Sequence, residues 1–202
     1  MNVWRRVEDT GARVALTFDD CDDAEAWTRI LDTLKAHGAK AAFFPNGFRA
    51  ERRPDLAART ATEGHSVGSH GWDHARLVRL PRAEIRRRLV QDRAFWKRIA
   101  GLELRFVRPP MGEYDDAVLE EVAAVGYTDV VLWDVDPADW RDGDSGLILD
   151  RVVASAREGS IVELHAVDAT AEALPQILER LRDGGLEARS LDELLGQEPE
   201  GR

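Results

Sequence analysis

The chain has 202 residues, of which 44% are hydrophobic and six are tryptophan, so it is long enough to bury one sizeable core. A formal net charge of −10 argues against a general binder of nucleic acid, because neutralising phosphates needs an excess of clustered lysine and arginine. The one basic run, Arg86-Arg87-Arg88, falls in an expected helix and is interpreted as its solvated face. A single cysteine excludes an internal disulfide and gives no sign of a secreted disulfide scaffold.

No linker rich in proline, glycine or serine divides the chain, so we expect one domain over residues 1–196 and a flexible polar tail at 197–202. The N-terminal segment holds no apolar stretch long enough for a signal peptide or a membrane span, although a catalytic part cut from a longer protein would look the same. We therefore expect a monomer that does not insert into a membrane, while the compartment stays open.

Short runs suited to β-strands alternate with longer amphipathic runs suited to helices. The expected strands are residues 14–18, 41–44, 65–70, 104–110, 129–136, 160–165 and 186–191, and the expected helices are residues 24–37, 54–63, 81–100, 115–125, 146–156 and 171–183. Repeated steps from strand to helix imply parallel strands joined by crossover helices, as in a closed barrel or an open doubly wound sheet.

Polar residues fall at the carboxyl ends of these expected strands, namely Asp19, Asp20, His70, His74, Arg108, Asp134, Asp136 and His165. In a parallel α/β barrel the carboxyl ends converge over a packed interior, and active sites are built there. An open sheet binds ligands mainly at one switch point and does not need residues from so many strands to meet. We therefore favour the barrel.

The segment LTFDDC ends an apolar run with two adjacent carboxylates. Neighbouring strand residues point to opposite faces, so Asp19 and Asp20 are expected to have different tasks. Acidic capping of the following helix is the alternative interpretation. It explains Asp22 or Asp23 but leaves Asp19 unexplained.

Two histidines lie four residues apart, as His70 and His74 in GSHGWDHARL. In a helical turn both imidazoles would project from one side and could hold a single metal ion. The spacing alone is weak evidence, since either histidine also suits a structural role or a helix cap. A carboxylate of LTFDDC is an available third ligand, and two histidines with one carboxylate and open positions suit Zn²⁺ or a similar divalent ion in a hydrolytic site.

Five short motifs in order, TFDD, H-x-x-x-H in SHGWDHARL, RPPMG, DPADW and ELH, resemble the signatures of the NodB-type polysaccharide deacetylases, carbohydrate esterase family 4. The resemblance spans about residues 14–194. It implies a distorted (β/α) barrel with about seven parallel strands. It also implies a hydrolase that removes acetyl groups from N-acetylated carbohydrate polymers such as chitin oligomers or peptidoglycan. O-deacetylation of acetylated xylan is the nearest variant.

The resemblance assigns a metal site and a base. Asp20, His70 and His74 would hold one divalent ion, Zn²⁺ or else Co²⁺ or a similar ion. Asp19 would be the general base that takes a proton from metal-bound water. Arg108 would keep Asp19 ionised by pairing with it.

The resemblance also assigns an acid and a pocket wall. His165 would be the general acid that protonates the leaving amine, and Asp136 would orient its imidazole and raise its pKa. Trp140 would wall the substrate pocket, although a tryptophan beside Asp139 also suits core or loop packing.

Four positions depart from the family pattern. Cys21 replaces the usual Gly, Gly71 replaces Ser or Thr, and Met111 replaces Tyr, where a backbone N–H toward the tetrahedral oxyanion would not depend on the side chain. The fourth, Glu163, replaces a leucine that forms part of an apolar recess for the acetyl methyl group.

Glu163 and His165 are two residues apart on a strand and should therefore share a face. Glu163 is expected either to pair with a local arginine or to take a new role, and in both cases to lower acetyl turnover. A carbohydrate-binding or metal-binding protein with little turnover therefore stays as the alternative function.

Overall fold

The computed structural model describes residues 1–196, so the expected flexible tail at 197–202 lies outside the described residues. The strands are β1 (Asn2–Trp4), β2 (Arg13–Asp20), β3 (Ala42–Pro45), β4 (Ser66–Ser69), β5 (Phe106–Val107), β6 (Asp129–Val131), β7 (Ile161–His165) and β8 (Glu187–Ala188). The helices are α1 (Ala24–Ala36), α2 (Gly47–Arg52), α3 (Pro54–Thr62), α4 (Arg82–Ala100), α5 (Asp116–Val125), α6 (Ser145–Ser155), α7 (Asp168–Asp183) and α8 (Leu191–Leu194), with 3₁₀ turns at Leu77–Arg79 and Pro110–Gly112. None of the helices within residues 1–196 is both long and apolar enough to cross a membrane.

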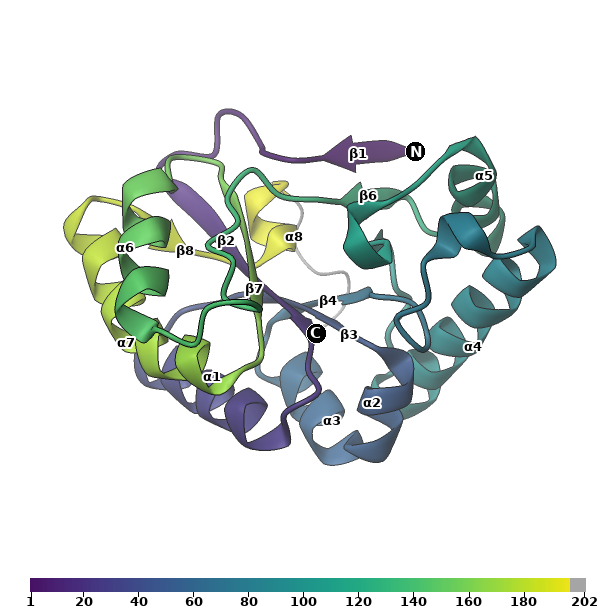
Figure 1. The fold of residues 1–202 in the computed structure, drawn as a ribbon, viewed down its shortest axis with the longest axis horizontal. Coiled ribbons are helices and arrows are strands. Elements are labelled where there is room, and N and C mark those ends of the chain that lie inside the picture. The colour runs from purple at the N-terminus through teal and green to yellow at the C-terminus, as the bar shows by residue number, and fades with distance from the viewer. Residues whose placement is uncertain (197–202) are drawn as a thin grey trace.

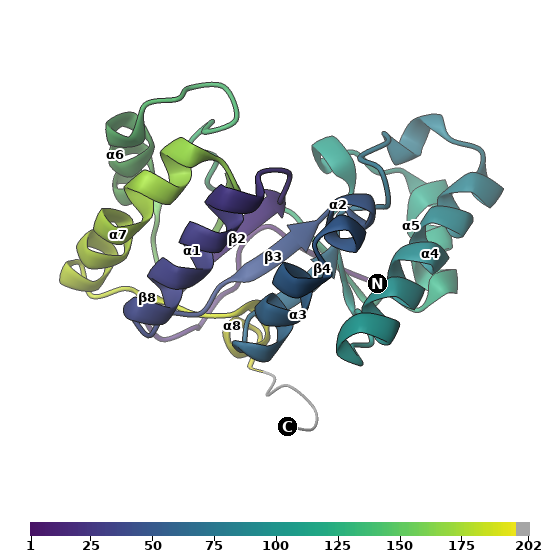
Figure 2. The same cartoon turned by 90° about the horizontal axis from the view of Figure 1, so that it is seen from below.

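The strands form one parallel sheet in the order β1-β6-β5-β4-β3-β2-β7, and β8 pairs with β2 off this path. The sheet curls, and Figure 1 shows α6, α7, α1, α3, α2, α4 and α5 following one another around its outside. Figure 2 shows the same helices from below. Isolated bridges between Arg6 and Ser160 and between Val135 and Val162 join the segments after β1 and β6 to the β7 side. The predicted distorted α/β barrel is thus confirmed.

Some strands are shorter than predicted, and some short elements were not predicted at all. β5 ends at Val107, because Arg108 is followed by Pro109 and Pro110, which have no N–H to donate to a ladder. The expected strand at 129–136 is regular only to Val131. β1, α2 and α8 have three, six and four residues, too few for a periodic pattern to indicate them.

The two faces of the strands carry two clusters of apolar side chains. The larger cluster lies between the sheet and the helices, whereas the smaller one fills the inside of the curl and includes Ala15, Phe44, Phe106, Val131 and Ile161. Because alternate residues share a face, Asp19 continues the inward series of Ala15, Arg108 that of Phe106, and His165 that of Ile161. The alternation that builds the core therefore also aims these three polar side chains inward.

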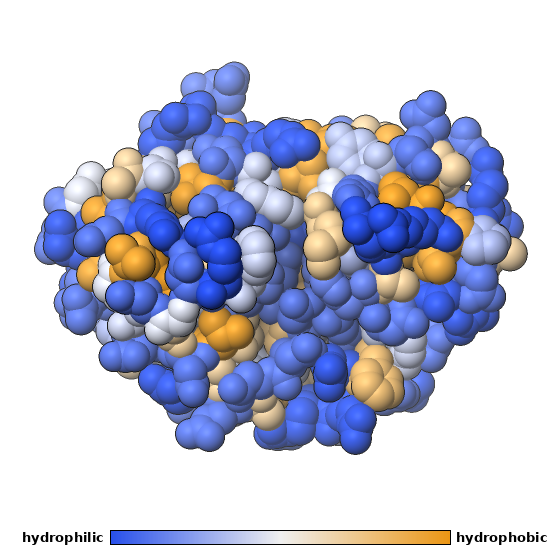
Figure 3. Space-filling view, viewed as in Figure 1, coloured by the Kyte–Doolittle hydropathy of each residue, from blue (hydrophilic) through white to orange (hydrophobic). Residues whose placement is uncertain are grey.

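The surface is predominantly polar. Figure 3 shows a mostly hydrophilic face with separate hydrophobic patches. The basic run on α4 is paired with acids, since Arg86 lies 2.7 Å from Glu121 and Arg88 lies 3.0 Å from Asp73. Arg86 is exposed and Arg88 is largely covered, so the run is only partly the solvated face that the sequence predicts.

Asp92 on α4 is a fully buried carboxylate. Among residues 1–196 neither of its oxygens has a hydrogen-bond partner, and the indole N–H of Trp96 has none either. Burial raises the pKa of Asp92 to about 7. Burial therefore favours the neutral, protonated form of this carboxyl group over the charged form.

We expect Asp92 to make the folded chain less stable as the pH rises. A carboxyl group whose pKa is higher in the folded state than in the unfolded state stabilises the folded state at pH values below its unfolded pKa. This contribution to the free energy of unfolding is lost as the pH rises through about 7. At about 1.4 kcal/mol per pKa unit the loss approaches roughly 4 kcal/mol. Asp92→Asn should flatten this dependence, as measured by urea unfolding between pH 4 and pH 8. The exposed Asp150→Asn is the matched control and should leave the slope unchanged.

Candidate active site

The predicted site residues meet at the carboxyl ends of the strands. Asp19 and Asp20 end β2, His70 follows β4, Arg108 follows β5, and His165 ends β7. β2 and β7 are neighbours, and their register places Asp19 beside His165. The side chains therefore come from distant parts of the sequence to one edge of the sheet, as the strand-end pattern predicts.

Three of these side chains form a compact group of metal-ligating atoms. Nε2 of His74 lies 3.5 Å from Oδ1 of Asp20, and Nε2 of His70 lies 3.7 Å from the same oxygen. Ligands at about 2.1 Å from a tetrahedral zinc ion are about 3.4 Å from one another, so these spacings fit such an ion. Asp20, His70 and His74 could hold a metal together.

Asp20 reaches this group through an unusual backbone conformation. By strand alternation it should point away from Asp19, but its φ of 63° lies in the left-handed region, which Asp tolerates better than most residues. The amide group of Asn46 donates to Oδ1 of Asp20 at 2.9 Å and helps to fix the carboxylate. The two adjacent acids therefore do have different surroundings. Asp23, not Asp19, caps α1 by accepting from Glu25 N and Ala26 N.

The two histidines converge from a loop and not from the helical turn that their spacing suggested. Residues 70–74 have no helical hydrogen bonds, and both Gly71 and His74 have a positive φ. The first two backbone N–H groups of α2 donate to the carbonyl oxygens of Gly71 and Trp72. Anchoring by the start of α2, and not helical periodicity, positions His74.

His70 is held in the tautomer that can bind a metal. Its Nδ1 lies 2.8 Å from the carbonyl oxygen of Arg108, which can only accept, so Nδ1 carries the proton and Nε2 is free. Burial lowers the pKa of His70, although Asp19 and Asp20 oppose this, and the neutral ligand form is therefore favoured.

Asp19 has one oxygen engaged and one free. Oδ1 accepts from Arg108 at 2.6 Å, whereas Oδ2 is buried and has no hydrogen-bond partner among residues 1–196. Oδ2 lies 3.7 Å from Nε2 of His70, beside the three metal-ligating side chains. A buried acceptor without a donor beside an anion-and-imidazole cluster fits a site that binds a metal ion with its water.

Arg108 is buried and donates hydrogen bonds to two segments, the end of β2 and the end of β6. Nη1 donates to Asp19 and to the hydroxyl of Thr17, Nε donates to the carbonyl of Val131, and Nη2 donates to the carbonyl of Leu132. The predicted pairing with Asp19 is present. The surface-arginine alternative is wrong, since the side chain has no exposed area.

His165 pairs with Asp139 and not with Asp136, which corrects the sequence prediction. Nδ1 of His165 lies 2.8 Å from Oδ1 of Asp139, whose other oxygen accepts from the His165 backbone N–H and the Thr170 hydroxyl. Asp136 instead accepts from the backbone N–H of Ala138 at 2.6 Å and closes a turn. An Asp before Pro is a typical turn residue, and this signal in DPADW could have identified Asp139 as the partner.

The environment of His165 favours its protonated form. Burial acts to lower its pKa, but Asp139, with help from Asp19 and Glu163, outweighs burial and raises the pKa to about 9. The imidazolium can therefore donate a proton at neutral pH.

Glu163 points to the same place as His165. Ligand atoms of Asp19, Glu163 and His165 all lie within 4.8 Å of one another. Of the two alternatives expected for Glu163, the ion pair with a local arginine is not found: within residues 1–196 no arginine or lysine pairs with its carboxyl group. Burial, followed by the charge of Asp19, raises the pKa of Glu163 well above its usual range.

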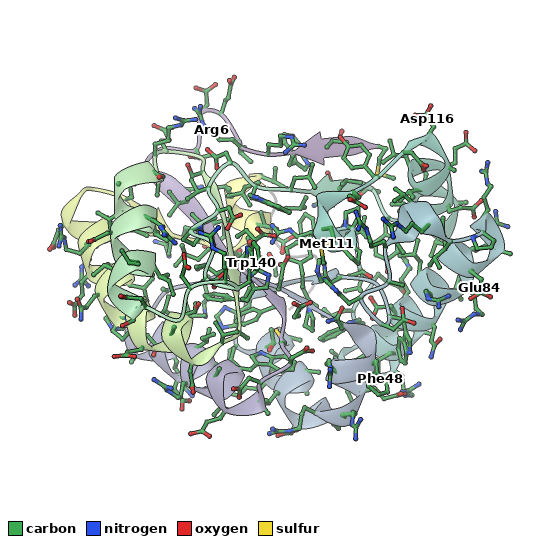
Figure 4. The ribbon with its side chains drawn as sticks, in the orientation of Figure 1. Arg6, Phe48, Glu84, Met111, Asp116 and Trp140 are labelled. Atoms are coloured by element: carbon green, nitrogen blue, oxygen red, sulfur yellow. The ribbon has the colours of Figure 1, made fainter. Side chains whose placement is uncertain are left out.

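Trp140 and Met111 lie at the surface, with 60% and 55% of their area exposed. Figure 4 shows both near the middle of the face that it presents. Exposure argues against the core-packing interpretation of Trp140. Met111 has a φ of 62°, and its proposed N–H toward an oxyanion stays a prediction. Cys21 also has a positive φ, 57°, which explains why glycine suits this position.

The chain is similar in sequence and in fold to several known proteins. A family model described as polysaccharide deacetylase matches residues 6–130. The peptidoglycan-N-acetylglucosamine deacetylase PgdA of Listeria monocytogenes is 35% identical over 189 residues, which cover 93% of this chain and 40% of that protein. A chitooligosaccharide deacetylase of Sinorhizobium fredii is 35% identical, with 90% of this chain and 92% of the relative covered.

Among solved structures, a CE4 family pseudoenzyme from Bacillus anthracis superposes with a TM-score of 0.90 at 27% identity, covering 96% of this chain and 68% of that one. The chain thus spans about two fifths of the Listeria relative but most of the Sinorhizobium one. Because the family model matches more than half of the residues, the chain belongs to the polysaccharide deacetylase family, carbohydrate esterase family 4.

Proposed function

We propose that this chain is a metal-dependent hydrolase that removes acetyl-type groups from the nitrogen of an N-acylated carbohydrate polymer, peptidoglycan or chitin oligomers. The observation that carries the proposal is the free, buried Oδ2 of Asp19, which lies 3.7 Å from Nε2 of His70, in a side chain that also lies close to His165. The relatives that act on peptidoglycan and on chitooligosaccharides support this substrate class.

Each residue has a task that follows from its contacts. A divalent ion bound by Asp20, His70 and His74 supplies a more acidic water and a polarised carbonyl. Asp19 accepts the water proton at Oδ2, while Arg108 holds its Oδ1 and keeps the carboxylate in place. His165, held by Asp139, gives its proton to the leaving nitrogen as the carbon–nitrogen bond breaks.

The second candidate function is carbohydrate or metal binding with little turnover. Two observations favour it: the polar side chain of Glu163 beside the base and acid, and the structural likeness to a pseudoenzyme. The presence of Asp19, Asp20, His70, His74, Arg108 and His165 favours the hydrolase.

We expect the purified chain to bind about one divalent ion, most strongly Zn²⁺ among those offered. His74→Ala should weaken zinc affinity by more than the 10- to 100-fold that loss of an outer-shell partner causes. His37→Ala, in which the replaced histidine caps the far end of α1, is the control and should bind normally. Metal analysis with competition by a chelator gives the affinity.

An assay of acetate release should accompany the metal analysis. It should use chito-oligomers, peptidoglycan and acetylated xylan as substrates. Metal-dependent release from none of them would leave the binding function as the better account, and release from xylan alone would identify an O-deacetylase.

A further inference from the structure

Glu163 lies beside the proposed base and the proposed acid. Its backbone is paired with Thr17 of β2, and its side chain lies on the inward face of β7 with that of His165. One of its carboxyl oxygens lies within 4.8 Å of a ligand atom of Asp19 and of one of His165. In the proposed reaction the carbonyl carbon lies between the water at Asp19 and the nitrogen at His165. The remaining substituent on that carbon is then next to Glu163.

The carboxyl group of Glu163 is without a partner in the described chain. Only 7% of the residue is exposed, and among residues 1–196 the side chain forms no hydrogen bond or ion pair. The charge of Arg108 acts on Glu163, but the hydrogen bonds that Arg108 donates go to Asp19, Thr17, Val131 and Leu132. The carboxyl group of this largely buried side chain therefore has no protein partner to compete with a ligand, and a ligand group that hydrogen-bonds to it binds favourably.

We propose that Glu163 selects the acyl group, and that this chain prefers an N-acyl group bearing a hydroxyl next to the carbonyl, such as 2-hydroxyacetyl, over acetyl. The inference rests on the proposed function and names the substrate class of the same site. A hydroxyl there can both donate to and accept from the Glu163 carboxyl group, whereas the methyl of acetyl leaves it unpaired. The raised pKa of Glu163 agrees with this, since the neutral carboxyl group can act as donor and acceptor.

The reaction balances without any additional reagent. The water oxygen bonds to the carbonyl carbon, its proton passes to Asp19, and the carbon–nitrogen bond breaks as His165 protonates the nitrogen. The products are the free amine of the sugar and 2-hydroxyacetate.

The test compares two versions of one chito-oligosaccharide, N-acetylated and N-(2-hydroxyacetylated), with the zinc-loaded chain. We expect the ratio of kcat/KM for hydroxyacetyl over acetyl to be at least about tenfold higher in the natural chain than in Glu163→Leu. The Leu variant should hydrolyse the acetyl substrate faster than the natural chain. Glu163→Gln keeps a hydrogen-bonding side chain and should retain most of the preference. Glu179→Leu removes an exposed carboxylate of α7 and should behave like the natural chain.

A second readout is independent of turnover. Calorimetry with 2-hydroxyacetate and acetate measures the same preference, and the negative charge common to both ligands cancels in the ratio. An unchanged ratio in Glu163→Leu in both measurements would overturn the proposal. So would a second zinc ion per chain that the Leu variant loses, because Glu163 would then be a metal ligand beside Asp19 and His165. If no variant releases any acyl group, the proposed function fails, while the calorimetric ratio still decides the role of Glu163.

Discussion

Asp19→Asn should lower the rate of N-deacetylation by about 10²- to 10⁴-fold and leave the metal content unchanged. Asn keeps an oxygen that can accept from Arg108, but it cannot take a proton at the position of the free Oδ2. Asp20→Asn should lose both activity and metal, because its Oδ1 is the oxygen closest to both imidazoles. Metal analysis and acetate release on the same preparations separate the two outcomes.

The control for this pair is Asp22→Asn, the same substitution two residues further on. Asp22 is exposed and pairs with Arg49 at 2.7 Å, so its loss should change neither metal content nor rate. If Asp19→Asn were as active as the natural chain, another group would have to be the base. If it lost its metal instead, Asp19 would be a ligand.

His165→Ala should lower the rate of amide cleavage far more than the rate of cleavage of an activated aryl ester. An amine needs a proton to leave, whereas a nitrophenolate does not, so only the first reaction depends on a general acid. We expect a loss of about 10²- to 10⁴-fold on the N-acetylated sugar and a much smaller loss on nitrophenyl acetate. Equal losses on both substrates would show that His165 is not the acid. His37→Ala again serves as the control.

The pH profile gives a second test of the acid. Activity should fall as the pH rises through about 9, where the raised pKa of His165 places its deprotonation. Removing the charge of its partner by Asp139→Asn should move this fall to lower pH by about one to three units. Asp136→Asn should leave it in place, since Asp136 only closes the turn with Ala138.

The strand-end pattern predicted most of the site because of how parallel sheets are built. Strand alternation fixes which side chains point inward, and parallel order brings the carboxyl ends together, so Asp19, Arg108 and His165 could be placed from sequence. The same local logic failed for His74, whose position depends on contacts between residues 70–74 and the start of α2. Helical spacing gave the right residues there for the wrong reason.

The spacing of acidic residues in the sequence could not identify the partner of His165, because the partner is determined by the local turn. Asp136 and Asp139 are only three residues apart, so spacing alone allows either of them to contact His165. Because Asp136 closes a turn with Ala138, it is Asp139 that faces the imidazole. The sequence likewise predicted that Glu163 shares a face with His165 but not that it lacks an arginine partner. That depends on how the donors of Arg108 are distributed among segments far apart in the chain.

The thiol of Cys21 can report local opening of the turn that follows β2. It is the only thiol, it is 3% exposed, and it directly follows Asp20, so a reagent can reach it only when the turn after β2 opens. Burial, together with the neighbouring carboxylates, also raises the pKa of the thiol, which keeps it unreactive while the turn is closed. The rate of alkylation of Cys21 therefore measures how often the segment that holds Asp20 leaves its folded position. An ion coordinated by Asp20 should slow this alkylation even when no substrate is present.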